Sequence, residues 1–376
     1  MQSKDGASPY FADLPPEIVT DVCLRLPAKS VGRFRCVSNP FRSMLSNPGF
    51  VKKHLALALR KVSDSVHGKL LVPSRHLHSV DLGSIRDGSV ATRVLAGVKE
   101  LSSYGLEPAT ITWVEIIGSS NGLVSIYTEK AGNFLYNPTT GEAKRLPDSI
   151  FPNFIDVMVV TSTSKHYGFG FDSLTDDYKL LKFVPSEEGF PCLDVYSLKT
   201  NSWNRISCVP FKHIGCNPGL EINGAVHWVV KLLKGQTPKR DVVAAFDLNT
   251  QDFRFIPLPD EAEDCKCMKV ATLKGRLYLV YDSIDKHEAM WVMNEYGVES
   301  SWTKIQLSMS FRSFTPLWSA KNSEEVLVQV DGKFVLYNFE FNTWKNLEFS
   351  NVTFRKMFLA HTYVESLISP NSYGNA

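Results

Sequence analysis

The chain reads Tyr10-Phe-Ala-Asp-Leu-Pro-Pro-Glu-Ile-Val19, Arg33-Phe-Arg-Cys-Val-Ser38 and Phe50-Val-Lys-Lys-His-Leu55 within its first 55 residues. Prolines and polar residues interrupt this segment repeatedly, so we expect a small all-α domain of three or four short helices over residues 10–60. So short a segment forms only a small hydrophobic core. Its apolar side chains exceed what such a core buries, and the surplus indicates burial either against a partner protein or against the larger domain of the same chain.

The basic residues of the chain concentrate in this segment. Residues 10–60 hold eight Lys/Arg and three Asp/Glu, although the whole chain has a net charge of only +2. Such a surplus favours an acidic protein surface through electrostatic steering, and it is equally typical of a solvated basic face. No block of Lys and Arg with interleaved aromatic residues indicates nucleic-acid binding.

The composition is that of an ordinary globular protein: 44% of the 376 residues are hydrophobic and 21% are charged. The sequence has no run of 18 apolar residues and no apolar leader, so we expect neither a membrane span nor secretion. The seven cysteines are scattered, which favours reduced thiols in the cytoplasm and/or nucleus. Cys265-Lys-Cys267 lacks a second cluster of ligands, so we expect no metal and no cofactor.

Four motifs make the first segment resemble a plant F-box. They are Leu14-Pro15-x-Glu17-Ile18, Leu24-x-Leu26-Pro27-x-Lys29-Ser30, Arg33-Phe34-Arg35-x-Val37-Ser38 and Asn47-Pro-x-Phe50. An F-box is the motif through which substrate receptors dock on the Skp1 subunit of a cullin-based ubiquitin ligase. The resemblance therefore implies a Skp1-like partner, with cullin-1 bound through Skp1. The residues that it places in or beneath the Skp1 interface are Leu14, Pro15, Ile18, Val19, Leu26, Pro27, Val31, Phe34, Val37, Ser38 and Phe41.

Phe41 departs from the family pattern. Many members have a tryptophan at this position and a lysine where this chain has Asn39. Phenylalanine buries less apolar area than tryptophan and lacks the indole N–H donor. We therefore expect Phe41 to change the affinity for particular Skp1 paralogues more than the mode of docking.

A different pattern occupies residues 68–369. Five segments share an apolar strand that ends in Asn, Asp or Ser, a polar turn, and a second strand that is often opened by an aromatic residue. The residue before the polar position is Tyr136, Tyr196, Phe246, Met293 or Tyr337. Intervals of 44 to 60 residues are typical of propeller blades with loops of variable length. With a weaker unit near residues 76–95, we predict an all-β, kelch-like propeller of six blades, in preference to a sandwich.

The opening unit lacks a first strand, so we expect a C-terminal strand within residues 357–366 to complete it and close the ring. The chain then divides into a disordered tail (1–9), the F-box (10–60), a short linker (61–67), the propeller (68–369) and a second disordered tail (370–376). A linker this short favours a fixed relation between the helices and the propeller.

The β region also resembles the F-box-associated domain of plant F-box proteins, of the F-box/kelch-repeat or S-locus F-box-like kind. The stretches that carry this resemblance are 118–123, 136–140, 167–172, 196–203 and 298–304. The resemblance implies a protein target that is marked for ubiquitination and proteasomal degradation. Targets implied by related proteins are immune receptors, self-incompatibility ribonucleases and other regulators.

Alternate connections between antiparallel strands lie at the same end of a blade, so the long connections share one face. We expect this face, which includes residues 283–289 and 308–315, to read the target. Two oppositely charged groups there form either a clamp for a charged target segment or a set of solvated loop charges. The groups are Lys231, Lys234, Lys239 and Arg240 on one side, and Asp260, Glu261, Glu263 and Asp264 on the other.

The sequence contains no recognisable catalytic pattern. Its nine histidines are spread out, and no His-Glu-x-x-His, Gly-x-Ser-x-Gly or phosphate-binding glycine loop occurs. We therefore predict a non-catalytic substrate adaptor of a Skp1–cullin–F-box (SCF) ubiquitin ligase. Two alternatives stay open: a Skp1-binding propeller scaffold without ubiquitin transfer, and a propeller enzyme.

Overall fold

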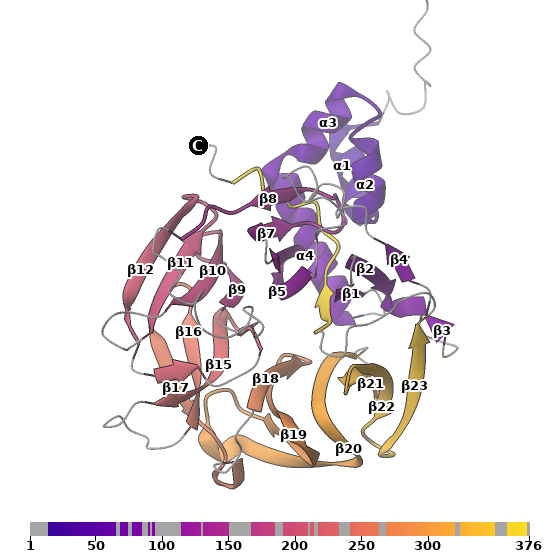
Figure 1. Cartoon of the computed structure of the whole chain (residues 1–376). Coiled ribbons are helices and arrows are strands. Elements are labelled where there is room, and N and C mark those ends of the chain that lie inside the picture. The colour runs from indigo at the N-terminus through magenta and orange to yellow at the C-terminus, as the bar shows by residue number, and fades with distance from the viewer. Residues whose placement is uncertain are drawn as a thin grey trace, which may run out of the picture.

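The computed structural model describes most of the chain (Figure 1). The described residues are 14–64, 68–73, 77–84, 89–90, 92–94, 114–128, 131–149, 167–184, 191–209, 211–213, 217–232, 241–262, 268–319, 324–349 and 359–373. They form a helical N-terminal unit followed by a propeller-like arrangement of β-sheets around a common centre, as the sequence predicts.

Four helices form the N-terminal unit, and the breaks between them fall at or next to the predicted prolines. The helices are α1 (Pro16–Arg25), α2 (Ala28–Phe34), α3 (Asn39–Ser46) and α4 (Pro48–Asp64). Ser38 caps α3, because its Oγ accepts a hydrogen bond from the Phe41 backbone N–H at 3.4 Å. The Arg35 guanidinium donates to the Leu45 carbonyl at 2.8 Å, which ties α3 to the end of α2.

The described strands form five sheets, four of which have the size of one propeller blade. Blade 1 has the order β24 (His361–Tyr363), β1 (Lys69–Pro73), β2 (Leu77–Asp81) and β4 (Thr92–Val94). Blade 2 contains β5 (Val114–Ser120), β6 (Leu123–Thr128), β7 (Gly132–Tyr136) and β8 (Ala143–Arg145). Blade 3 contains β9 (Tyr167–Asp172), β10 (Asp177–Val184), β11 (Cys192–Ser197) and β12 (Ser202–Cys208). Blade 4 contains β13 (Phe211–His213), β14 (Leu220–Ile222), β15 (Ala225–Leu232), β16 (Asp241–Asp247) and β17 (Phe253–Pro257).

The fifth sheet has seven strands, so the prediction of six separate blades is wrong. Its strands are β18 (Met268–Leu273), β19 (Arg276–Met293), β20 (Trp302–Ser319), β21 (Glu325–Val330), β22 (Lys333–Asn338), β23 (Thr343–Phe349) and β3 (Ser89–Val90). β20 pairs with β19 through residues 302–306 and with β21 through residues 314–319, so it joins what the sequence presented as two blades. Residues 283–289 and 308–315, which were expected to be loops on the target face, lie within β19 and β20.

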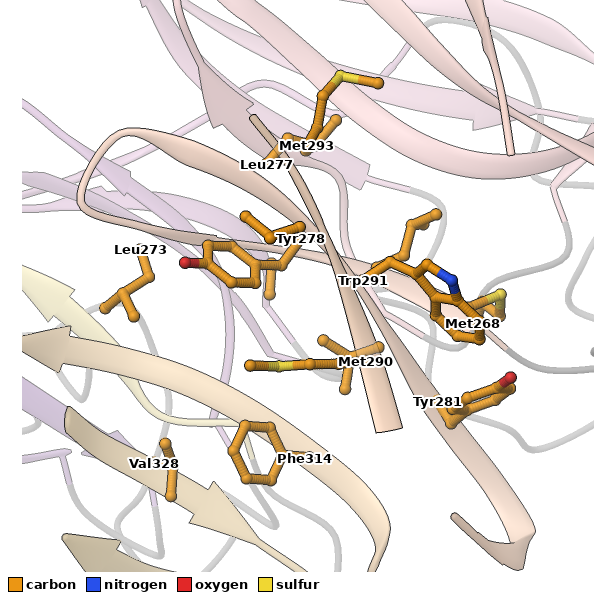
Figure 2. Close-up of a cluster of buried hydrophobic side chains, with 14 of the residues drawn as sticks. Met268, Leu273, Leu277, Tyr278, Tyr281, Met290, Trp291, Met293, Phe314 and Val328 are labelled. Atoms are coloured by element: carbon orange, nitrogen blue, oxygen red, sulfur yellow. The ribbon is translucent and has the colours of Figure 1, made fainter. Parts of the chain in front are cut away.

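The chain reverses direction within β19. Ten residues of extended strand span about 33 Å, yet the ring centroids of Tyr281 and Trp291 are only 5.3 Å apart. Figure 2 shows Leu277 beside Met293 at the other end of the same element. Met290 of the returning half belongs to the buried apolar cluster that holds the seven-stranded sheet together.

The C-terminal strand joins the first sheet, as predicted. β24 pairs antiparallel with β1, with Leu70 opposite Thr362. The Tyr363 hydroxyl and the Ser79 hydroxyl are hydrogen-bonded at 2.8 Å, which connects β24 to β2 beyond its neighbour. No sheet of described strands closes on itself, so the ring depends on packing between sheets rather than on a continuous ladder.

The repeated sequence pattern corresponds to the turn between the last two strands of a unit. The apolar residue before each turn (Tyr136, Tyr196, Phe246, Met293 or Tyr337) is buried. In four of the five units the polar residue after it closes the turn with its side chain, whereas Asn294 donates across its turn to the Ser301 carbonyl. The Asn137 Oδ1 accepts from the Thr139 N–H at 2.8 Å, and the Asp247 Oδ1 accepts from the Asn249 N–H at 2.9 Å. This Asx turn explains why Asn, Asp or Ser recurs there.

Candidate functional site

One side of α1 carries an exposed apolar stripe. Leu14, which precedes α1 by two residues, is 44% exposed, and Ile18 and Val22, one helical turn apart on the same side of α1, are 50% and 48% exposed. Val37, just after α2, is 65% exposed. Large apolar side chains clustered in this way on the surface are typical of a protein-interaction site.

The opposite side of α1 faces the core. Cys23 is 4% exposed, and Val19 packs against the same apolar cluster. α1 is therefore apolar on two sides, only one of which the described chain covers. This is the surplus of apolar surface that the sequence predicts.

The structure divides the predicted Skp1-contact residues into two groups. The exposed group consists of Leu14, Pro15, Ile18, Pro27, Val37 and Ser38. The group that is partly or fully buried consists of Val19, Leu26, Val31, Phe34 and Phe41. Val22 belongs with the exposed group but was not among the predicted contacts, although its spacing from Leu14 and Ile18 marks it.

Phe41 lies in the second group. Its ring centroid is 6.1 Å from that of Phe34, and it packs against the same cluster as Val19. Phe41 therefore contributes to the packing between the helices.

The helical unit is mounted on one face of the propeller, which we call the short-turn face. Turns at residues 121–122, 137–142 and 173–176, between consecutive strands of blades 2 and 3, form this face. Lys52 of α4 makes an ion pair of 2.6 Å with Asp176 in one of these turns. A single apolar cluster contains Val31 and Leu45 of the helices together with Leu123 and Leu135 of blade 2. Direct packing therefore holds the two units together.

The ends of the described strands that lead into the long connections lie on the face away from the helices. The described part of that face contains Lys231, Asp260 and Glu261 of the predicted charge clamp. Lys231 lies opposite Asp241 in the sheet, and Glu261 makes an ion pair of 2.8 Å with Lys304. Lys234, Lys239, Arg240, Glu263 and Asp264 lie outside the described residues. The structure therefore does not place the two charged groups relative to each other, and the charge clamp stays a prediction.

Two observations on the described residues bear on the alternative of a propeller enzyme. Among them, no group of three or more His, Cys, Asp or Glu side chains is placed to hold a metal ion. A polar recess of about 370 Å³ beside β19 and β20 is lined by Lys286, His287, Glu288, Lys304 and Gln306, among others. In the described part of the chain, no helix is long and apolar enough to cross a membrane.

Comparison with known proteins identifies the class. Residues 11–53 match the F-box domain, and residues 100–361 match the F-box associated beta propeller domain. The chain therefore belongs to the family of F-box proteins with an F-box-associated propeller domain.

Its relatives include several proteins of Arabidopsis thaliana. F-box protein CPR1 is 30% identical over 362 residues, covering 88% of this chain and 83% of the relative. F-box/kelch-repeat protein At3g23880 is 26% identical and covers 98% of both chains. F-box protein At4g22390 is 27% identical, covering 95% of this chain and 90% of the relative. These matches run through both the helices and the propeller.

Proposed function

We propose that this protein is the substrate-recognition subunit of an SCF ubiquitin ligase. The observation that carries the proposal is the exposed stripe of Leu14, Ile18 and Val22, which lies within the F-box match on helices that are otherwise anchored to the propeller. Burial of this stripe against a Skp1-like partner removes apolar surface from water at about 25 cal/mol per Å². Cullin-1 then joins through Skp1.

The propeller binds the protein target in this proposal, on the face opposite the F-box. Members of this family act as adaptors, and we propose that this chain likewise contributes placement and no chemistry. An adaptor raises the effective concentration of a target lysine next to the conjugating enzyme. In this proposal the adaptor acts in the cytoplasm and/or nucleus.

The substitution Ile18→Glu tests the docking surface. Ile18 is half exposed, so the helix tolerates the change, but an unpaired carboxylate buried in an apolar interface costs several kcal/mol. We expect Skp1 affinity to fall about a hundredfold or more, measured by calorimetry or surface plasmon resonance. Leu174→Glu is the matched control, because Leu174 is 78% exposed and lies outside the F-box. Equal Skp1 affinity of the Ile18→Glu and Leu174→Glu proteins would refute the docking proposal.

A second measurement separates the adaptor from the two alternatives. Proximity labelling with and without a proteasome inhibitor identifies candidate targets. The half-life of a true target lengthens when the cullin is depleted. A scaffold without ubiquitin transfer leaves that half-life unchanged, and a propeller enzyme does not require Skp1 at all.

A further inference from the structure

The chain does not leave the propeller after the closing strand β24. Residues 364–373, which we call the C-terminal strap, run between the short-turn face and the F-box helices (Figure 1). Ser366 is fully buried, and Leu367 and Ile368 are 2% and 5% exposed. Residues 370–373 were expected to belong to a disordered tail, yet the Tyr373 ring packs edge-on against Tyr178 of β10, with centroids 5.6 Å apart.

Asn137 of blade 2 holds the strap on its propeller side. Its fully buried Nδ2 donates to the Ser366 carbonyl at 3.1 Å and to the Ile368 carbonyl at 2.6 Å. Its Oδ1 closes the β7–β8 turn, as the corresponding Asn338 and Asp247 do in other units. The strap therefore requires an amide at position 137, because a carboxylate closes the turn but has no hydrogen to donate.

The strap also lies tightly against the neighbouring turn. Gly122, between β5 and β6, has a φ of +83°, and a Cβ there would clash with the Ser366 side chain. The Ser366 N–H donates to the Thr139 hydroxyl at 3.2 Å, and the Ser369 hydroxyl donates to the Glu142 carboxylate. The surface of blade 2 is thus complementary in shape to the strap and supplies hydrogen-bond partners for it.

The other side of the strap contacts the F-box. Glu365 makes an ion pair of 2.8 Å with Lys29 of α2, with both side chains less than a third exposed. Leu367 and Ile368 belong to the same apolar cluster as Val31 and Leu45 of the helices. The strap therefore touches both units at once, whereas the covalent connection between them is residues 65–67 alone.

We propose that the C-terminal strap is a positioning element that fixes the F-box on the propeller. It sets the direction and distance from the Skp1-docking stripe to the target-reading face, and hence where the ligase presents a target lysine. This inference rests on the proposed adaptor function for its biological meaning. The strap contacts themselves stand independently of it.

The substitution Asn137→Asp tests the strap, with Asn338→Asp as the matched control. Both keep the turn-closing oxygen, and Asp247 shows that this turn accepts an aspartate. Only Asn137→Asp removes the two donors to the strap. Labels attached through non-natural residues at the exposed positions Ser46 and Lys345 report the distance between F-box and propeller in the full chain, free and bound to Skp1. We expect Asn137→Asp to broaden the distance distribution at least twofold and Asn338→Asp to leave it unchanged.

The ion pair between Lys29 and Glu365 gives a second, independent test of the strap if the Asn137→Asp protein fails to fold. Lys29→Glu places two carboxylates side by side and should broaden the distribution of distances between the two labels. Lys29→Glu combined with Glu365→Lys restores the pair in reverse and should narrow that distribution again. Skp1 affinity should stay within threefold in all of these variants, because none alters the exposed stripe. An unchanged width in folded Asn137→Asp or in Lys29→Glu overturns the strap proposal. Failure of the parent chain to bind Skp1 overturns the adaptor function instead and leaves the distances readable.

Discussion

The buried residue His227 sets a pH limit on the propeller. Its ring lies within hydrogen-bond distance of the Tyr296 hydroxyl (2.7 Å) and the Leu220 carbonyl (3.2 Å). The carbonyl can only accept, so Nδ1 carries the hydrogen and Nε2 accepts from the phenol. Complete burial disfavours the charged ring and lowers the pKa of His227 to about 4.

The pH dependence follows from that shift. Below about pH 6.5 the unfolded chain protonates His227 and the folded chain does not, so the free energy of unfolding falls as the pH falls toward 4. The loss from this one residue is about 3 kcal/mol at most. His227→Gln should therefore flatten the dependence of stability on pH, measured by denaturant unfolding between pH 7.5 and 4.5. Tyr296→Phe keeps the titrating ring and should retain the slope. Equal slopes for the parent and His227→Gln would contradict this role.

Single residues also show where spacing stops being informative. The spacing of Ile18 and Val22, with Val19 and Cys23 beside them, indicates a broad apolar stripe along α1. It does not say which side meets α4, because that choice depends on packing between residues far apart in the chain. Val31 illustrates the limit: the resemblance places it in or beneath the Skp1 interface, and only the fold shows that it is completely buried.

At the scale of the element, the strand β24 completes blade 1. Leu70 and Leu71 of β1 are fully buried and lie opposite Thr362 and His361. A chain ending at residue 360 should aggregate or be degraded, because the inner edge of β1 loses its partner. A chain ending at Tyr363 keeps β24 and should melt cooperatively, although it lacks the strap. Light scattering and thermal melts of the two products distinguish them. A soluble, cooperatively melting chain that ends at residue 360 is the contrary result.

Hairpin turns were predictable because neighbouring residues in the sequence determine them. Asn223-Gly224 indicates a tight hairpin turn, and the structure gives these residues φ values of 54° and 75°. The turns after Tyr136 and Phe246 were found in the same way. The blade count failed because it depends on pairing: β20 stays hydrogen-bonded through residues that look like a loop, and it joins two units into one sheet.

At the scale of the whole molecule, the shared apolar cluster predicts that F-box and propeller unfold together. Leu45 of α3 is fully buried in the cluster that also contains Leu135 of β7 and Tyr178 of β10. Leu45→Ala should lower stability by about 2–5 kcal/mol and shift a single melting transition. Amide hydrogen exchange should accelerate in α1–α4 and also in β7 and β10, because the buried helix residues of the described chain share one core with these strands. Leu279→Ala, equally buried in the cluster of the seven-stranded sheet, is the control and should accelerate exchange first in β18–β22. Two melting transitions, with Leu45→Ala moving only the one reported by the helices, would show that the F-box is an independent unit carried by the propeller.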